Sequence, residues 1–141
     1  MKVYLIGSLR NERIPVIANE LREMGLDVFD DWFAPVPEAD DFWRDYAKKR
    51  GLSYAEALEG YAARHVFEFD KSHIDDSDVG VLVLPAGKSG HLELGYMLGC
   101  GKPGFVFFPD GEPERWDVMY QFAEGLAFNM EQLKRQLARV R

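Results

Sequence analysis

The chain has 141 residues, 47% of them hydrophobic and 13% aromatic, which predicts one domain over residues 1–141 whose core needs no metal or disulfide. Its formal net charge of −7 argues against binding a nucleic-acid polymer through a basic face, although one nucleotide can still bind where the local field is favourable. The single cysteine, Cys100, excludes an intrachain disulfide and fits a reducing compartment.

Neither a secretion signal nor a membrane span is predicted. The opening apolar run at residues 3–6 is too short for a signal peptide and enters Gly7 and Ser8 directly. No stretch approaches the roughly 20 apolar residues of a membrane helix. We therefore expect a cytoplasmic protein with no membrane partner.

The first segment of the chain predicts a strand, a helix and a second strand. Residues 3–6 (VYLI) form a short apolar run stopped by Gly7 and Ser8. Apolar residues then recur at helical spacing from Ile14 to Met24, and Gly25 is suited to end that helix. Residues 26–30 are predicted as a second strand, so the segment is a βαβ unit with parallel strands and a right-handed crossover.

The middle of the chain predicts a loop followed by helices. Residues 31–41 contain two prolines and four acidic residues and are predicted as a loop. Helical patterns run from 42 to about 50 and from 53 to about 73. Ser53 and Glu56 have the spacing of a capping box.

The second half of the chain predicts three more strands. Residues 79–84 (VGVLVL) are the most apolar candidate and should be central, buried on both faces. A tight loop at 85–90 precedes a helix from His91 to about Cys100 and a strand at 103–108. A polar loop at 110–117 leads to a short helical stretch near Met119, an edge strand at 126–128, and a last helix capped by Asn129 and running to about Val140.

Strands that alternate with helices predict the fold class. We expect an α/β, doubly wound, flavodoxin- or Rossmann-like sheet of five parallel strands flanked by helices. In such sheets the ligand binds beyond the carboxyl ends of the strands, where the strand order reverses. This rule gathers the loops after Ile6, Phe29 and Leu84 at one edge, and we expect the chemistry there.

The loop at residues 87–90 is a candidate anion site. Gly87 and Gly90 permit close backbone approach, and the unpaired amides of a helix start attract an anion. Lys88 and Ser89 add a charge and a hydroxyl suited to a phosphate. The segment does not match a Walker A motif, so a plain turn of small residues fits equally well. Glu93, in the first turn or so of the helix and flanked by apolar residues, is either a dipole-stabilised helix residue or a catalytic group.

Aromatic residues raise a further choice between packing and binding. Trp32, Phe33, Phe42 and Trp43 either form a satellite core under the long insertion or present a wall on which a flat heterocycle stacks. Tyr4 either packs in the core or extends its hydroxyl to a carboxylate at the sheet edge.

No motif predicts a metal or a cofactor. The acidic run at residues 75–78 lacks the spacing of a calcium loop and fits a solvated turn. The histidines at positions 65, 73 and 91 have no zinc-site spacing.

Three motifs together resemble the nucleoside 2-deoxyribosyltransferase superfamily, including its nucleotide-hydrolysing branch. They are the opening VYLIGS with Arg10, the stretch from Asp70 to Asp78 that runs into VGV, and GKSGHLELGY at 87–96 followed by GKP at 101–103. The resemblance covers nearly the whole chain. Residues 31–64 and the form SGHLE are most similar to pyrimidine nucleoside 5′-monophosphate hydrolases of nucleoside-antibiotic pathways.

The resemblance implies a retaining double displacement at an N-glycosidic bond. Glu93 would attack the anomeric carbon, Tyr4 would orient Glu93, and Asp70 would contact the base and help to protonate it. Gly7, Ser8 and Arg10 would line the sugar and phosphate. The family also implies a homodimer or larger homo-oligomer, with residues 110–120 as the candidate segment that completes a neighbour's pocket.

One departure from the family pattern favours a nucleotide substrate. Deoxyribosyltransferases commonly carry a base-binding aspartate six residues before the nucleophile, and Gly87 stands there instead. Because Lys88 and Ser89 suit a 5′-phosphate, we expect a nucleoside 5′-monophosphate N-glycosidase acting on a pyrimidine nucleotide such as CMP or dCMP. The alternatives are a deoxyribosyltransferase that exchanges bases on nucleosides, a nucleotide sensor without turnover, and a flavin-carrying electron carrier.

Overall fold

The computed structural model describes residues 1–33 and 39–140 and contains one parallel sheet. Its strands are β1 (Lys2–Ile6), β2 (Asp27–Phe29), β3 (Val79–Val83), β4 (Gly104–Phe107) and β5 (Gly125–Ala127). They are ordered β2-β1-β3-β4-β5, and every neighbouring pair is parallel. The predicted five-stranded α/β fold is confirmed.

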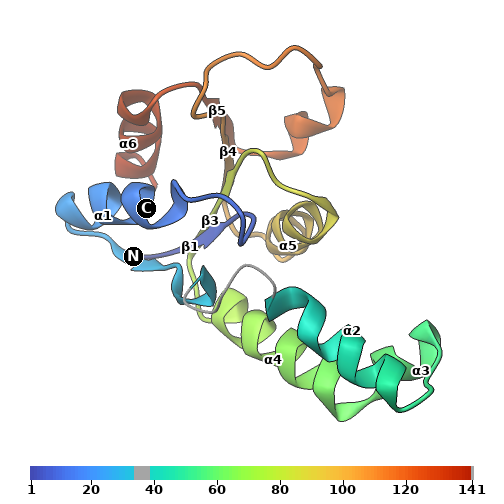
Figure 1. The fold of residues 1–141 in the computed structure, drawn as a ribbon. Helices are drawn as coiled ribbons and strands as arrows, with labels where there is room; N and C mark the ends of the chain where they lie inside the picture. Colours follow the sequence, from blue (N-terminus) through green and yellow to red (C-terminus); the bar gives the residue numbers. More distant parts are fainter. Residues whose placement is uncertain (34–38, 141) are drawn as a thin grey trace.

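Helices cover both faces of this sheet (Figure 1). On one face α1 (Ile14–Glu23) and α6 (Met130–Ala138) pack their buried side chains against Val3 and Leu5. On the other face α4 (Tyr61–Asp75) and α5 (Lys88–Gly99) cover Tyr4 and Ile6. Alternate residues of β1 thus enter two separate apolar clusters, as the period of a strand requires.

The strand order reverses between β1 and β3. From β1 the chain crosses to β2 on one side, and after β2 it returns to β3 on the other side of β1. In doubly wound sheets this is the point where the loops at the carboxyl ends diverge and leave a crevice. The loops after Ile6 and Val83 flank it.

Three predicted boundaries of the helices and loops are wrong. The helix predicted over 53–73 is interrupted at Gly60, whose extended backbone (φ −80°, ψ 165°) ends α3 (Tyr54–Glu59) and precedes α4. The loop predicted over 31–41 begins with the 3₁₀ helix η1 (Asp31–Phe33) and ends inside α2 (Ala39–Lys49), while 34–38 lie outside the described residues. The capping box is confirmed, because Ser53 Oγ accepts from the Glu56 amide and Glu56 Oε1 from the Ser53 amide.

The third wrong boundary concerns α5, which starts at Lys88 and not at His91. Gly90 makes this early start possible, because a Cβ there would lie 3.1 Å from Leu82 Cδ1 and 3.2 Å from Ile6 Cγ2. Without a side chain, the first turn packs directly on β1 and β3. Glu93 is consequently in the second turn, where the helix dipole acts on it less than predicted.

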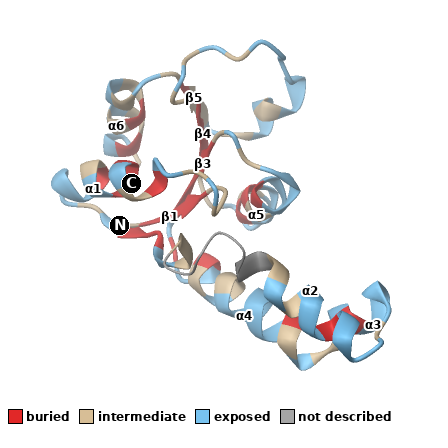
Figure 2. Cartoon of the chain, viewed as in Figure 1, coloured by how far each residue is buried: buried red, intermediate tan, exposed pale blue. Residues whose placement is uncertain are grey.

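A helical arm extends from the sheet. It consists of α2, α3 and the first half of α4, which lie side by side away from the strands (Figure 1). Alanines 47, 57 and 63 are buried within it, whereas most of its surface is exposed (Figure 2). Over the described residues, no helix combines the length and apolar character needed to cross a membrane.

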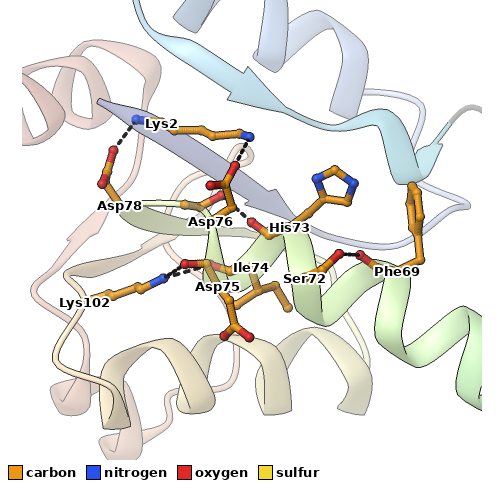
Figure 3. A network of polar contacts seen from close by, with 10 residues as sticks. Lys2, Phe69, Ser72, His73, Ile74, Asp75, Asp76, Asp78 and Lys102 are labelled. Carbon is orange, nitrogen blue, oxygen red and sulfur yellow. Dashed lines mark hydrogen bonds and ion pairs between the residues drawn. The ribbon is translucent and has the colours of Figure 1, made fainter.

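The carboxyl end of α4 is tied to the sheet by charged contacts (Figure 3). The ammonium of Lys102 donates to the carbonyl oxygens of Ile74 (3.0 Å) and Asp75 (2.7 Å) in the last turn of the helix, where the dipole favours a positive charge. Lys2 Nζ lies 2.6 Å from Asp76 Oδ2, and the Lys2 amide donates to Asp78 at 2.7 Å. These contacts fix α4 relative to the start of β1.

Replacing Gly80 by valine tests how tightly α5 packs on β3. A Cβ at Gly80 would lie 2.7 Å from Sδ of Met97, which is fully buried. Because a packed core resists added volume, Gly80→Val should lower the free energy of unfolding by about 1–3 kcal/mol in a urea titration. The control is Gly99→Ala at the end of α5, where a new Cβ meets open space among the described residues, and it should not destabilise the protein. Wild-type stability of Gly80→Val would contradict this packing.

Candidate active site

Tyr4, Asp70 and Glu93 come together on the face of the sheet covered by α4 and α5. Tyr4 lies in the middle of β1 and is 1% exposed. Its hydroxyl lies close enough to the carboxylate of Glu93 on α5 for a hydrogen-bonding interaction to shift the pKa of both groups. Asp70 on α4 is close enough to interact electrostatically with both. Three elements distant in sequence therefore supply one cluster of a phenol and two carboxyl groups.

Burial sets the protonation of this cluster. The pKa of Glu93 is raised to about 7, first by burial and then by the charge of Asp70, while hydrogen bonding from Tyr4 opposes the rise. Burial also raises the pKa of Asp70, an effect that the charge of His73 partly offsets. The pKa of Tyr4 is raised by burial and by both carboxylates, so its hydroxyl stays protonated and donates to Glu93.

The two carboxyl groups interact and therefore exchange protons as a pair. Each charge disfavours the other, so the first proton leaves more readily than the second. A site of this kind can keep one carboxylate ionised while the other carries a proton at near-neutral pH. Because the charge of Asp70 raises the pKa of Glu93, the shared proton lies on Glu93 in the free protein, and a reaction with Glu93 as nucleophile and Asp70 as general acid requires it to move to Asp70.

An aromatic stack supports the cluster from the side of β2. The Phe29 ring stacks on Tyr4 at 5.5 Å and on His73 at 4.0 Å between centroids. Phe69 directly precedes Asp70 in the chain. Its ring packs edge to face against His73, at 4.8 Å between centroids. The stack fixes both the Tyr4 ring and the turn of α4 that carries Asp70. Sequence reasoning missed this role of Phe29, Phe69 and His73, although His73 follows Asp70 by one helical turn.

A groove of about 500 Å³ opens at the strand-order reversal, between the loop after β1 and the loop after β3. Its lining residues are Ser8, Arg10, Asn11, Glu12, Arg13, Pro85, Ala86 and Gly87. A larger depression of about 1000 Å³ lies near the amino ends of β4 and β5, and Tyr4, Asp70 and Glu93 belong to the lining of neither hollow. We favour the smaller groove as the ligand site, because parallel sheets bind ligands at the carboxyl ends of their strands.

The groove carries two arginines. Arg10 pairs with Asp41 at 3.5 Å, and Arg13 with Asp110 at 2.7 Å. The Nδ2 atom of Asn11 is buried and has no hydrogen-bond partner in the described part of the chain. Asn11 and Arg13 were not singled out from the sequence, although both belong to the loop after β1 that already pointed to Arg10.

The other predicted binding residues divide between the groove and its supports. Ser8 and Arg10 line the groove, and Gly7 supports it, because a Cβ there would lie 2.6 Å from Ile14 Cδ1 of α1. Gly87 lines the opposite wall. Gly90 is buried in the first turn of α5, where it faces β1 and β3. The side chains of Lys88 and Ser89 are exposed in the first turn of α5 and are not among the described lining residues.

The two tryptophans differ in how they are held. Trp32 donates its indole N–H to the carbonyl of Leu5 at 2.7 Å and packs against both apolar clusters. This contact ties η1 to β1, as the satellite-core interpretation requires. Trp43 is half-buried on α2. Among the residues described, no group of three or more histidine, cysteine or acidic side chains is arranged to hold a metal ion.

Comparison with known proteins places the fold. No family model matches the sequence, and no curated protein matches it. The 2-deoxyribosyltransferase of Bacillus psychrosaccharolyticus is 20% identical, with a TM-score of 0.65 over 95% of this chain and 90% of that one. The Clostridium botulinum CMP N-glycosidase BcmB is 15% identical, with a TM-score of 0.54 over 98% and 99%. A conserved protein from Enterococcus faecalis V583 is 11% identical, with a TM-score of 0.67 over 99% and 98%.

The chain shares their fold. At these identities the likeness concerns the fold alone, so the chemistry must be argued from the residues of this chain.

The raised pKa of Glu93 predicts a pH-dependent stability. Between the ordinary value of 4.5 and about 7, the native protein holds a proton that the unfolded chain has lost, so stability falls as pH rises through this range. Glu93→Gln cannot ionise and should be more stable than wild type above pH 7, by up to about 3 kcal/mol. The difference should vanish near pH 4. Urea titrations at about pH 4, 6 and 8 measure it, and a difference independent of pH would contradict a buried, ionisable Glu93.

Proposed function

We propose that the protein is a nucleoside 5′-monophosphate N-glycosidase that hydrolyses the bond between base and sugar through a covalent glycosyl-enzyme. The observation that carries the proposal is the convergence of Glu93, Tyr4 and Asp70. It supplies a nucleophile, a donor that orients it, and a second carboxyl group as proton source. A protein that only binds nucleotides needs no such half-buried pair of acids.

The first step breaks the glycosidic bond. A carboxylate oxygen of Glu93 attacks C1′ of the sugar while the electron pair of the C1′–N bond leaves with the base. The proton of Asp70 passes to the departing base, which would otherwise leave as an anion. General acid catalysis of this kind contributes a factor of order 10²–10⁴. The products are a glycosyl ester on Glu93 and a neutral base.

The reaction itself favours the protonation state that the mechanism requires, with Glu93 ionised and the shared proton on Asp70. Positive charge develops at C1′ as the base departs, beside the carboxylate of Glu93. That charge stabilises the ionised form of Glu93 and so shifts the proton of the interacting pair to Asp70. The hydroxyl of Tyr4 donates to the carboxylate of Glu93 and holds it in place while that carboxylate forms its bond to C1′.

The second step regenerates the enzyme. Water attacks C1′ of the ester, the C1′–O bond to Glu93 breaks, and the water proton goes to the carboxylate of Asp70. If a second base attacks in place of water, the outcome is base exchange. Hydrolysis and transfer therefore share every residue and differ only in the acceptor.

The groove at the strand-order reversal favours a phosphorylated substrate. Arg10 and Arg13 supply positive charge in a chain of net charge −7, and Asn11 offers a buried donor without a described partner. Such groups suit phosphate oxygens better than a 5′-hydroxyl. The exposed Lys88 and Ser89 lie at the start of α5, next to Gly87 of the groove wall. The likeness to a CMP N-glycosidase supports a pyrimidine nucleotide such as CMP or dCMP as the substrate.

Replacing the nucleophile tests the proposal directly. Glu93→Gln removes the attacking charge but keeps the size of the side chain, so release of cytosine from CMP should fall at least about 1000-fold. Chromatography of the free base measures it. Glu131→Gln, an exposed glutamate in the first turn of α6, is the matched control and should keep wild-type activity. Undiminished turnover by Glu93→Gln would rule out this mechanism.

Substrate choice separates the hydrolase from the runner-up, a nucleoside 2-deoxyribosyltransferase, which the first structural neighbour favours. The wild-type protein should release base from CMP or dCMP faster than from cytidine or deoxycytidine. It should not need an acceptor base, because water resolves the ester. Base exchange between deoxycytidine and adenine, without release of free base from nucleotides, would reverse this ranking.

A further inference from the structure

His91 connects the start of α5 with the segment that follows β4. Its Nδ1 lies 2.8 Å from the carbonyl oxygen of Gly87, and its Nε2 lies 2.9 Å from the hydroxyl of Tyr120 in η2 (Val118–Phe122). The backbone amide of His91 also donates to the Gly87 carbonyl, at 3.3 Å. One side chain thus contacts both the N-cap residue of α5 and a distant turn.

The partners of the ring determine where its proton lies. A carbonyl oxygen can only accept, so Nδ1 of His91 must carry the hydrogen. In the neutral ring Nε2 then has a free lone pair and accepts the hydroxyl hydrogen of Tyr120. Burial and the charge of Asp117 raise the pKa of Tyr120, so the hydroxyl keeps that hydrogen.

Tyr120 is itself held in place. Its ring packs edge-on against Phe108 at 5.7 Å between centroids. At the other end of the same segment, Asp110 pairs with Arg13 at 2.7 Å. The segment is therefore attached to both sides of the groove, through Arg13 on the β1 side and through His91 and Gly87 on the β3 side.

We propose that His91 is a positioning residue for the phosphate-binding wall: anchored by Tyr120, it holds the Gly87 carbonyl and so orients the loop that begins α5. This inference rests on the proposed function, because it assumes that the substrate's phosphate occupies the groove. His91 touches no reacting atom in this account. It acts by preventing the Pro85–Gly87 loop from turning away from the arginines opposite.

The hydrogen-bond arrangement can be tested without any substrate. Long-range ¹⁵N–¹H NMR spectra of the imidazole rings, assigned with His91→Asn, distinguish the two neutral tautomers. We expect His91 to carry its hydrogen on Nδ1 in the wild-type protein at neutral pH, and Tyr120→Phe to change the Nε2 shift. A hydrogen on Nε2 would overturn the proposal.

Binding measurements test the consequence for the wall. In a Glu93→Gln background, which does not consume the ligand, Tyr120→Phe should weaken CMP binding about five-fold and leave cytidine binding unchanged. His91→Asn should have at least the same effect. The matched controls are Tyr61→Phe and His65→Asn, which alter exposed residues of α4 and should change neither affinity.

Two outcomes separate this inference from the proposed function. Equal weakening of CMP and cytidine, or no weakening by Tyr120→Phe, would overturn the role of His91 even if the enzyme hydrolyses CMP. Tight CMP binding with the expected five-fold loss, but no base release by the wild-type protein, would support His91 and overturn the hydrolase.

Discussion

The interaction between the Tyr4 hydroxyl and the Glu93 carboxylate is the one on which the candidate site depends. A carboxylate removed from water beside a second carboxyl group is unfavourable unless a donor is fixed in front of it. Tyr4 can provide that donor because β1 lies inside the sheet, between β2 and β3, and cannot move away. The ring is fixed in turn by Phe29, which also stacks with His73. The central strand β1 thus supports the carboxylate of Glu93, the group whose charge is hardest to accommodate in the site.

The surrounding architecture makes two independent helices meet at this interaction. α4 brings Asp70 from the arm side and is anchored at its carboxyl end by Lys2 and Lys102, far from the chemistry. α5 brings Glu93 and approaches the strands closely because Gly80, Gly90 and Gly104 leave room for its side chains and backbone. Small displacements of either helix would separate the two carboxyl groups and weaken the charge interaction that adds to the effect of burial on the pKa of Glu93.

The local charge of the groove differs from the net charge of the chain. Although the chain is acidic overall, two arginines line the crevice at the strand-order reversal, each already paired with an aspartate. These surface pairs are weak, so an incoming phosphate can share the guanidinium groups at little cost. The pairs hold the long side chains near the crevice before a ligand arrives, which reduces the entropy lost on binding. A local basic site is therefore compatible with a strongly negative protein.

The sequence by itself determined the fold class and the order of the elements, and it predicted the edge at which a ligand should bind and the candidate residues Tyr4, Asp70 and Glu93. Hydrophobic periodicity, turn residues and family motifs are local signals, and local signals are enough for these conclusions. Only the tertiary structure decided that the three side chains meet, that Trp32 is tied to Leu5, that α5 begins at Lys88, and that His91 pairs with Tyr120. Each of these depends on atoms distant in the chain: a pKa responds to burial and neighbouring charges, and the start of a helix can depend on the space left by a glycine against another strand.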